Sequence, residues 1–441
     1  MNPALGNEGC RGVDVHTIFA HKMWTWSGLL LSKCEQLPML SQLNRMSQLS
    51  VVCLLALPLT AAAGVPEPAA GSAAAIVPTA LRIGFGSCVR QDRPAPIFEK
   101  LASIKPDVFV FLGDNIYGDT EDMAVMRSKY ATLAALPGFT ELRGQAKIVA
   151  TWDDHDYGKN DAGVEFAAKA ASQREFCDFW NLPADALPRM REGVHDAVMI
   201  DSGMIGPDGK PDASTRTQII TLDTRTFRST LARRSERTPA SPGPYTASDD
   251  AAATVLGQAQ WKWLELELAK PAAVRIIASS IQVVATDHGY ETWGNFPAER
   301  KRLLKLISGA SAAGDAAKVI ISGDRHWGEI SVQPKDEAAG AEHGVIDVTS
   351  SALNQKRSAN STDANARRIG QAVSVANAGM IDVRWDRTDA ASGWKPTMSV
   401  QLIDEAGAII VTHTLAELLE NKPATGTAAP AAAAPAAPAP K

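Results

Sequence analysis

The sequence predicts an α/β fold that contains parallel strands, and three features support this prediction. Residues 81–88 read as a first strand that ends in small residues and a thiol, residues 96–104 suit a helix, and residues 107–113 form a second, buried strand. A strand, a helix and a strand with short connections make a βαβ unit, which implies parallel pairing. Several apolar runs are also followed directly by charged side chains, as in open α/β sheets, whose sites lie beyond the carboxyl ends of the strands.

Composition indicates one globular domain with atypical ends. With 441 residues, 45% hydrophobic and 21% charged residues, the chain can bury a large core, and its net charge of -5 gives no clear track for nucleic acid. We therefore expect a folded domain over residues 81–420. Residues 421–441 are rich in Ala and Pro, which favours a disordered tail because such a segment buries too little apolar surface.

The N-terminal region predicts export. Residues 39–63 resemble a signal peptide: Arg45 precedes an apolar core of about a dozen residues, and small residues suit cleavage after Ala63. A buried helix is the alternative, but the Ala/Pro/Gly linker over 64–80 favours export, by a Sec-type route because no twin-arginine pair is present. The core is shorter than the roughly 20 residues that a membrane span needs. We expect a periplasmic or secreted protein without a transmembrane segment in the mature chain, and a true start downstream of residues 1–38.

Export would leave two cysteines, Cys88 and Cys177, in the mature chain. In an oxidising compartment these two could form a disulfide. Cys88 also stands at the end of the strand predicted over 81–88, where a thiolate could bind a metal ion. Both interpretations remain open from the sequence.

Charged side chains follow three more predicted strands. Asp114 and Tyr117 follow the strand at 107–113, although Asp, Asn and Gly also favour plain turns. The strand at 147–152 leads into Asp153, Asp154, His155 and Asp156, whose mutual repulsion is destabilising unless a cation neutralises it or the loop is solvated. The strand at 318–323, the last clear parallel-type strand, leads into Asp324, Arg325 and His326.

The remaining elements complete an α/β sandwich. Asp223, Arg225 and Arg228 follow one predicted strand, where structural salt bridges are expected. The helix at 258–268 places Trp261 on an apolar face that suits the core. Helices are expected at 121–136, 165–180 and 297–308, strands at 197–200, 217–222, 274–280, 344–349, 379–385, 398–403 and 408–412, and long loops at 203–214 and 229–255.

The side chains at these strand ends suit two metal ions. One thiolate, one phenolate, several carboxylates and a single histidine fit a hard or borderline trivalent ion beside a divalent ion that prefers oxygen. Two metal ions bridged by one carboxylate form a clamp for in-line displacement at phosphorus. His155 would protonate the leaving alkoxide with Asp156 orienting it, and Arg325 would bind a phosphate oxygen.

Four motifs together resemble those of PhoD-type alkaline phosphatases, a branch of the calcineurin-like metallophosphoesterases. They are Gly86-Ser-Cys88, Gly113-Asp-Asn-Ile-Tyr117, Trp152-Asp-Asp-His-Asp156 and Ser322-Gly-Asp-Arg-His326. The segments 222–225 and 293–296 are also similar, and the resemblance covers about residues 81–410.

The resemblance implies a four-layer αββα sandwich, with two central mixed sheets flanked by helices and a dimetal site at the sheet edges. It implies Fe³⁺ and Ca²⁺, with Zn²⁺ or Mn²⁺ as alternatives. Asp114 would bridge the two ions, and His155 matches the proton-donating histidine. Carried over by motif, the iron ligands would be Cys88, Asp114, Tyr117 and His326, and the calcium ligands Asp114, Asp154 and Asp324, with Asn160 or Asp153 as further ligands.

The function implied is an exported, metal-dependent phosphoric ester hydrolase that acts on mono- or diesters by attack of a metal-activated hydroxide. The alternatives are an exported nuclease or phospholipase-type phosphodiesterase with the same site, and a non-catalytic metal-dependent phosphate-binding protein. We expect a monomer whose partner is the phosphate-ester substrate. Three departures from the superfamily bear on metal identity. Ser87-Cys88 replaces Asp-x-His, and Asp324 and His326 replace the paired histidines of the last motif. An expected histidine is also absent near Ser279, Ser280 and Gln282.

Overall fold

The computed structural model describes residues 81–206, 210–239, 241–309, 317–357, 363–386 and 394–420. These residues belong to one compact unit, which spans Ala74–Lys441. The predictions for the signal peptide, the linker over 64–80 and the tail over 421–441 fall outside the described residues. Within the described ranges, no helix combines the length and the apolar character that a membrane crossing requires.

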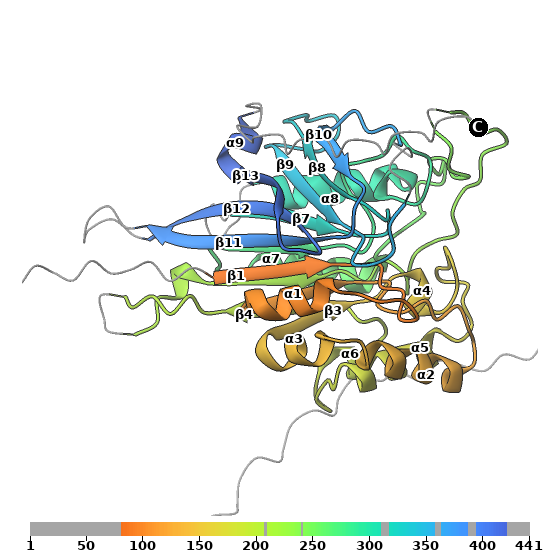
Figure 1. Ribbon diagram of the computed structural model, residues 1–441. Coiled ribbons are helices and arrows are strands. Elements are labelled where there is room, and N and C mark those ends of the chain that lie inside the picture. The colour runs from red at the N-terminus through yellow and green to blue at the C-terminus, as the bar shows by residue number, and fades with distance from the viewer. Residues whose placement is uncertain are drawn as a thin grey trace, which may run out of the picture. The chain divides into compact units, whose positions relative to one another are not determined.

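Two mixed β-sheets form the centre of this unit (Figure 1). The first sheet has the strand order β13 (Ile409–Thr414), β12 (Lys395–Asp404), β11 (Asn377–Asp386), β1 (Leu81–Gly86), β2 (Val108–Leu112) and β3 (Lys147–Thr151). The second has the order β10 (Arg368–Val373), β8 (Gly328–Gln333), β9 (Val345–Ser350), β7 (Ala317–Ser322), β6 (Val274–Ala278), β5 (Thr217–Thr221) and β4 (Asp196–Ile200). Strands β1, β2 and β3 are parallel, as are β5, β6, β7 and β9.

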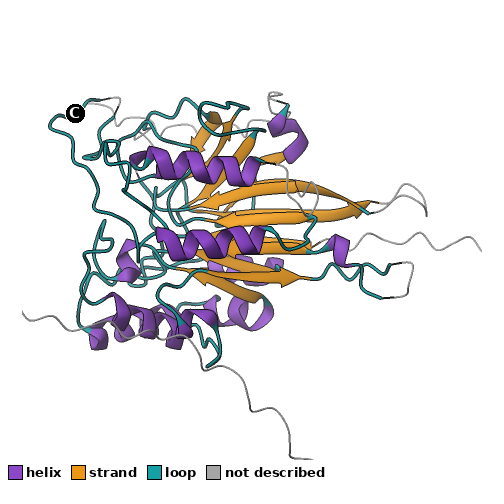
Figure 2. Ribbon diagram, turned by 180° about the vertical axis from the view of Figure 1, so that it is seen from behind, coloured by secondary structure: helices purple, strands orange, loops and turns teal. Residues whose placement is uncertain are grey.

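Helices cover the outer face of each sheet. Helices α1, α2, α3 and α5 lie together on the side of the first sheet, and α7 and α8, which lie behind the sheets in Figure 1, lie in front of them in Figure 2. The helices are α1 (Ile97–Ile104), α2 (Met123–Ala134), α3 (Phe139–Gln145), α4 (Asp154–Tyr157), α5 (Lys169–Phe179), α6 (Leu187–Met190), α7 (Gly257–Leu268), α8 (Pro297–Ser308) and α9 (Leu415–Leu419), with 3₁₀ turns η1 (Ala213–Thr215) and η2 (Trp293–Asn295).

Three hydrophobic clusters separate these four layers. In β2, Phe109 and Phe111 pack toward the helices, whereas Val108 and Val110 pack between the sheets. Successive side chains of a strand point to opposite faces, so a strand covered on both sides must be apolar throughout. The third cluster joins the second sheet to α7 and α8, and Trp261 belongs to it as expected. The predicted αββα architecture is therefore confirmed.

The ends of most predicted helices and strands lie within one to three residues of the observed ends. The differences concern the pairing of strands and a few elements that were not predicted. The prediction that 318–323 is the last parallel-type strand is wrong, because β9 pairs parallel with β7 and antiparallel with β8. Strand β8 was not predicted, nor were β10 and α3. Strand β1 lies beside β11 in Figure 1, although almost 300 residues separate them along the chain, and no local pattern specifies such a partner.

Candidate metal centre

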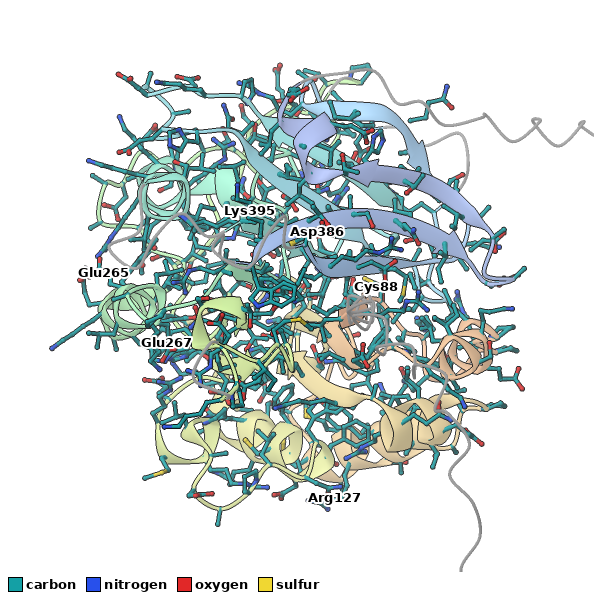
Figure 3. All side chains as sticks on the ribbon, turned by 90° about the vertical axis from the view of Figure 1, so that its left-hand side faces the viewer. Cys88, Arg127, Glu265, Glu267, Asp386 and Lys395 are labelled. Atoms are coloured by element: carbon teal, nitrogen blue, oxygen red, sulfur yellow. The ribbon has the colours of Figure 1, made fainter. Side chains whose placement is uncertain are left out.

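The carboxyl ends of β1, β2 and β3 bring the first predicted ligands together. Because the three strands are parallel and in register, Cys88 and Asp114, each two residues beyond its strand, reach the same edge. Cys88 Sγ lies 3.4 Å from Asp114 Oδ2. Cys88 lies near the middle of Figure 3, between the two halves of the sandwich. The βαβ prediction therefore placed these two side chains correctly.

Two groups of donor atoms share Asp114. Cys88, Asp114 and His326 form one group, and Asp114, Asp154 and His155 form the other; within each group the ligand atoms lie within 4.8 Å of one another. Tyr117 joins the first group, because its Oη lies 2.9 Å from His326 Nε2. One carboxylate thus lies where two neighbouring ions would need a bridge.

The backbone at this edge has an unusual conformation. Cys88, Asp114, Asp324 and His326 have φ values of 63°, 49°, 70° and 62°. Side chains with a Cβ seldom adopt this left-handed region, and it persists where the surroundings enforce it, often at functional sites. Four of the predicted ligands are therefore held in strained turns directly after their strands.

Gly113 explains how β2 and the loop after β3 approach each other so closely. Its φ is 98°, and a Cβ at this position would lie 2.5 Å from the backbone nitrogen of Asp153. Only glycine avoids both the strain and the clash. The glycine of the second motif is thus a requirement of backbone geometry.

The electrostatics of the donor set fit metal ions. Burial, followed by the nearby Asp114, raises the pKa of the Cys88 thiol well above its usual value. Burial also raises the pKa of Asp114, whose Oδ1 atom is buried without a hydrogen-bond partner, and that of Tyr117. These acids disfavour ionisation while no cation neutralises them. A bound cation reverses this effect, because it stabilises the deprotonated thiol, phenol and carboxylate. The residues present therefore fit the metal ions that the resemblance implies.

Asp154 and His155 form a pair of opposite character. Burial alone would raise the pKa of Asp154, but His155, Arg225 and the backbone N–H of Asp161 outweigh it and lower the pKa to about 2. Burial opposes protonation of His155, but Asp154, Asp114 and Asp119 raise its pKa to about 11. These three carboxylates favour the protonated form of the imidazole.

Asp119 orients His155, which corrects the expectation that Asp156 does so. His155 Nδ1 lies 2.8 Å from Asp119 Oδ1. Asp156 instead accepts hydrogen bonds from the backbone N–H groups of Asp114, Asn115 and Asp153, at 3.2, 3.3 and 2.6 Å. Neighbouring residues on α4 do not face each other, so the two side chains diverge. Asp156 thus holds the loop after β2 against the loop after β3.

Asp153 lies in a buried ion network. Its Oδ1 accepts hydrogen bonds from Arg225 Nε at 2.6 Å and from Ser280 Oγ at 2.8 Å. Arg225 also binds Glu291 at 2.7 Å, and Arg228 binds Glu291 at 2.8 Å. The predicted structural role of Arg225 and Arg228 is confirmed. Ser280, one of the residues near the absent superfamily histidine, donates its hydroxyl to Asp153.

A cavity of about 350 Å³ opens onto the centre. Asp324 and Arg325 line it together with the exposed Asn160. Burial raises the pKa of Asp324 to about 7 against the effect of Arg325. Burial, Arg325 and His155 lower the pKa of His326 to about 3, which keeps its imidazole neutral, as a metal ligand must be. The full lining is Asp114, Asp154, His155, Asn160, Asp161, Arg237, Pro244, Tyr290, Glu291, Asp324, Arg325, His326 and Arg357.

Cys88 and Cys177 are both free and buried, so the disulfide alternative does not hold in the structure. Cys177 lies in α5, and its Sγ lies 3.6 Å from the carbonyl oxygen of Pro188. The Cys88 Sγ faces hydroxyls instead, 3.2 Å from Ser351 Oγ and 3.3 Å from Ser87 Oγ.

Sequence reasoning missed several residues of the site. Asp119 ends the segment that contains Asp114 and Tyr117, so a second carboxylate in that loop was an available signal. No signal in the sequence identifies the cavity residues Arg237, Tyr290 and Arg357, because only the tertiary fold brings them to the cavity.

The chain has an α/β fold of two mixed sheets flanked by helices, with acidic and histidine side chains at the strand ends. Residues 215–394 match the model of the PhoD-like phosphatase family, which confirms the resemblance seen in the motifs. A solved structure described as PhoD has the same fold, with a TM-score of 0.54 and 17% identity over 76% of this chain and 72% of that chain. A dimetal phosphatase from Danio rerio matches with a TM-score of 0.42 and 12% identity over 77% and 99% of the two chains. No curated protein sequence matches the chain.

Proposed function

We propose that the protein hydrolyses phosphate esters with two metal ions. The observation that supports this proposal most directly is that Asp114 lies within 4.8 Å of Cys88 and His326 in one donor group and of Asp154 in the other. The same cavity presents His155 and Arg325, a proton donor and a cation suited to a phosphate oxygen. The match to the PhoD-like phosphatase family supports the same reaction class.

The donor chemistry suggests which ion each group would hold. A thiolate and a phenolate favour a ferric ion, whereas carboxylates favour calcium. When bound, such ions supply Lewis-acid stabilisation and lower the pKa of an attacking water. The first ion would be held by Cys88, Asp114, Tyr117 and His326, and the second by Asp114, Asp154 and Asp324, with Asn160 at the cavity wall.

The protein's own groups have separate tasks in this reaction. Asp119 binds His155 Nδ1, so Nε2–H is the proton that His155 can donate to the leaving oxygen. Arg325 would bind a non-bridging phosphate oxygen, since its guanidinium lines the cavity beside Asp324. Asp156 and Arg225 would contact neither the transferred proton nor the phosphate. They position the loops that carry the candidate metal ligands.

Metal analysis combined with two variants tests the proposal. We expect the purified protein to contain iron and calcium and to hydrolyse an aryl phosphate. Asp114→Asn should lose both metal and hydrolysis, whereas His155→Asn should lose hydrolysis and keep its metal. Loss of metal in His155→Asn would make His155 a ligand instead of a proton donor. Stoichiometric zinc without iron would contradict the thiolate–phenolate argument, and a metal-loaded protein that binds phosphate without hydrolysis would contradict the enzyme assignment.

Substrate and location belong to the same proposal. Comparing monoester with diester hydrolysis by the metal-loaded protein separates a phosphatase from a nuclease- or phospholipase-type phosphodiesterase. The signal-peptide pattern over 39–63 supports export. An N-terminus at or near Gly64 in the native protein would agree with export, and a native protein that begins at Met1 would contradict it. Light scattering tests the expected monomer.

A further inference from the structure

The cavity has a second wall, formed by residues that the proposed reaction does not use. Arg237, Pro244, Tyr290 and Arg357 line the cavity together with the predicted metal ligands. Arg325 is already assigned to the reacting phosphate. Two arginines on the cavity surface therefore remain without a partner in the chemistry.

Tyr290 and Asp363 hold Arg357 in place. The Cζ atoms of Arg325 and Arg357 lie 4.3 and 5.3 Å from the centroid of the Tyr290 ring, within the range of cation–π contacts. Asp363 binds both guanidinium groups, at 2.6 and 2.8 Å. The side chain of Arg325 is 6% exposed, whereas that of Arg357 is 26% exposed, so Arg357 can reach a ligand.

The charges at this wall are unbalanced. One carboxylate, Asp363, faces two guanidinium groups once Asp324 is bound to a cation. Arg237 is exposed, and no ion pair with another described residue neutralises it. The carboxylates that also line the cavity are engaged elsewhere: Asp161 accepts a hydrogen bond from Tyr245 Oη at 2.5 Å, and Glu291 pairs with arginines. Of the side chains on this wall, Arg237 and Arg357 are the ones that offer a cation to a ligand.

We propose that Arg357 and Arg237 bind a second anionic group of the substrate, so that the preferred phosphate esters carry a carboxylate or another phosphate on the leaving group. A guanidinium held in a fixed plane suits either anion, because both accept paired hydrogen bonds. The side chain of Arg357 is already ordered, so little conformational entropy is lost on binding. This inference rests on the proposed function, since it assigns the remainder of the same substrate.

The kinetic test compares 4-carboxyphenyl phosphate with its neutral analogue, 4-carbamoylphenyl phosphate. We expect the metal-loaded protein to prefer the carboxylate in kcat/KM. Arg357→Gln and Arg237→Gln should each reduce this preference by about tenfold, mainly through KM, the effect of losing one charged hydrogen bond. The intrinsic reactivities of the two esters cancel in the comparison between variants. Arg237 is exposed, so its variant tests the inference even if Arg357→Gln does not fold.

Arg384→Gln is the charge-matched control. Arg384 is exposed on β11, whose neighbouring Val383 pairs with Leu81 at the opposite end of β1 from Cys88. This variant should keep the full preference. An unchanged preference in both cavity variants, or an equal loss in the control, would overturn the inference. Replacing the carboxylate by a phosphate, in 1,4-phenylene bisphosphate, shows which anion the wall prefers.

A binding measurement separates this inference from the proposed function. If the protein hydrolyses neither ester, the proposed function fails, but calorimetric titration with 4-(phosphonomethyl)benzoate and its benzamide still tests the two arginines. Tighter binding of the benzoate that Arg357→Gln and Arg237→Gln reduce by about tenfold would support the inference. Equal binding of the two compounds would overturn it.

Discussion

The contact between Asp119 and His155 leads to a quantitative prediction about Asp119→Asn. The two side chains meet at 2.8 Å, with His155 15% and Asp119 43% exposed. A hydrogen bond to a charged group contributes about 1.5–3 kcal/mol, and solvent around the half-exposed carboxylate reduces this to about 1 kcal/mol. That energy corresponds to about a fivefold loss of kcat if Asp119 orients the proton donor in the transition state.

The leaving group shows whether proton donation is the step affected. Phenyl phosphate has a basic leaving oxygen that needs a proton, whereas 4-nitrophenyl phosphate needs it far less. Asp119→Asn should therefore slow phenyl phosphate about fivefold and 4-nitrophenyl phosphate less, with unchanged metal content. Asp178→Asn is the control: it removes a 66% exposed carboxylate of α5 that pairs with Arg189, and it should alter neither rate. Equal losses for the two esters would refute the orienting role.

Three further predictions follow from burial and backbone geometry. Arg225→Met should destabilise the protein by about 3 kcal/mol or more, because it leaves buried carboxylates unpaired, whereas Arg216→Met, whose partner Asp201 is 61% exposed, should hardly move the urea midpoint. Gly113→Ala should lower both the melting temperature and metal content, since its Cβ would lie 2.5 Å from the backbone nitrogen of Asp153; an unchanged melting temperature would contradict the clash. Burial and Arg191 lower the pKa of His195 from 6.5 to about 4, so the unfolded chain takes up a proton first as the pH falls from 6.5 to 4. Stability is therefore lost over this interval, by roughly 3 kcal/mol from this group, and His195→Gln should show a shallower decline in urea unfolding measured from pH 7 to 4.

The predictability of the site differed from residue to residue. The βαβ unit was sufficient to bring Cys88 to Asp114, because parallel strands deliver their carboxyl ends to one edge. The role of Asp156 was not predictable from adjacency to His155, since side-chain direction on α4 decides the partner. Asp119 took that role from another loop.

The strands also differ in how far the sequence predicts them. Strands β1, β2 and β6 were recognisable because burial on both faces requires nearly continuous apolar runs. Strand β8 was missed because its residues, GEISVQ, mix polar and apolar side chains, although all six are buried in the structure. Burial in this case follows from the neighbouring strands β9 and β10.

The sequence by itself determined the βαβ unit, the turns after its strands and the chemical types of the candidate metal ligands, because each depends on residues close together in the chain. Only the tertiary structure decided that Asp114 is shared by two donor groups and that Asp153 pairs with Arg225. It also brought Arg237 and Arg357 to the wall of the cavity that the metal-ligand candidates line. The contact of Asp153 with Arg225 joins residues 72 apart, and His326 lies more than 200 residues from Asp114. Such partners are selected by the packing of elements distant in the chain, which no local pattern encodes.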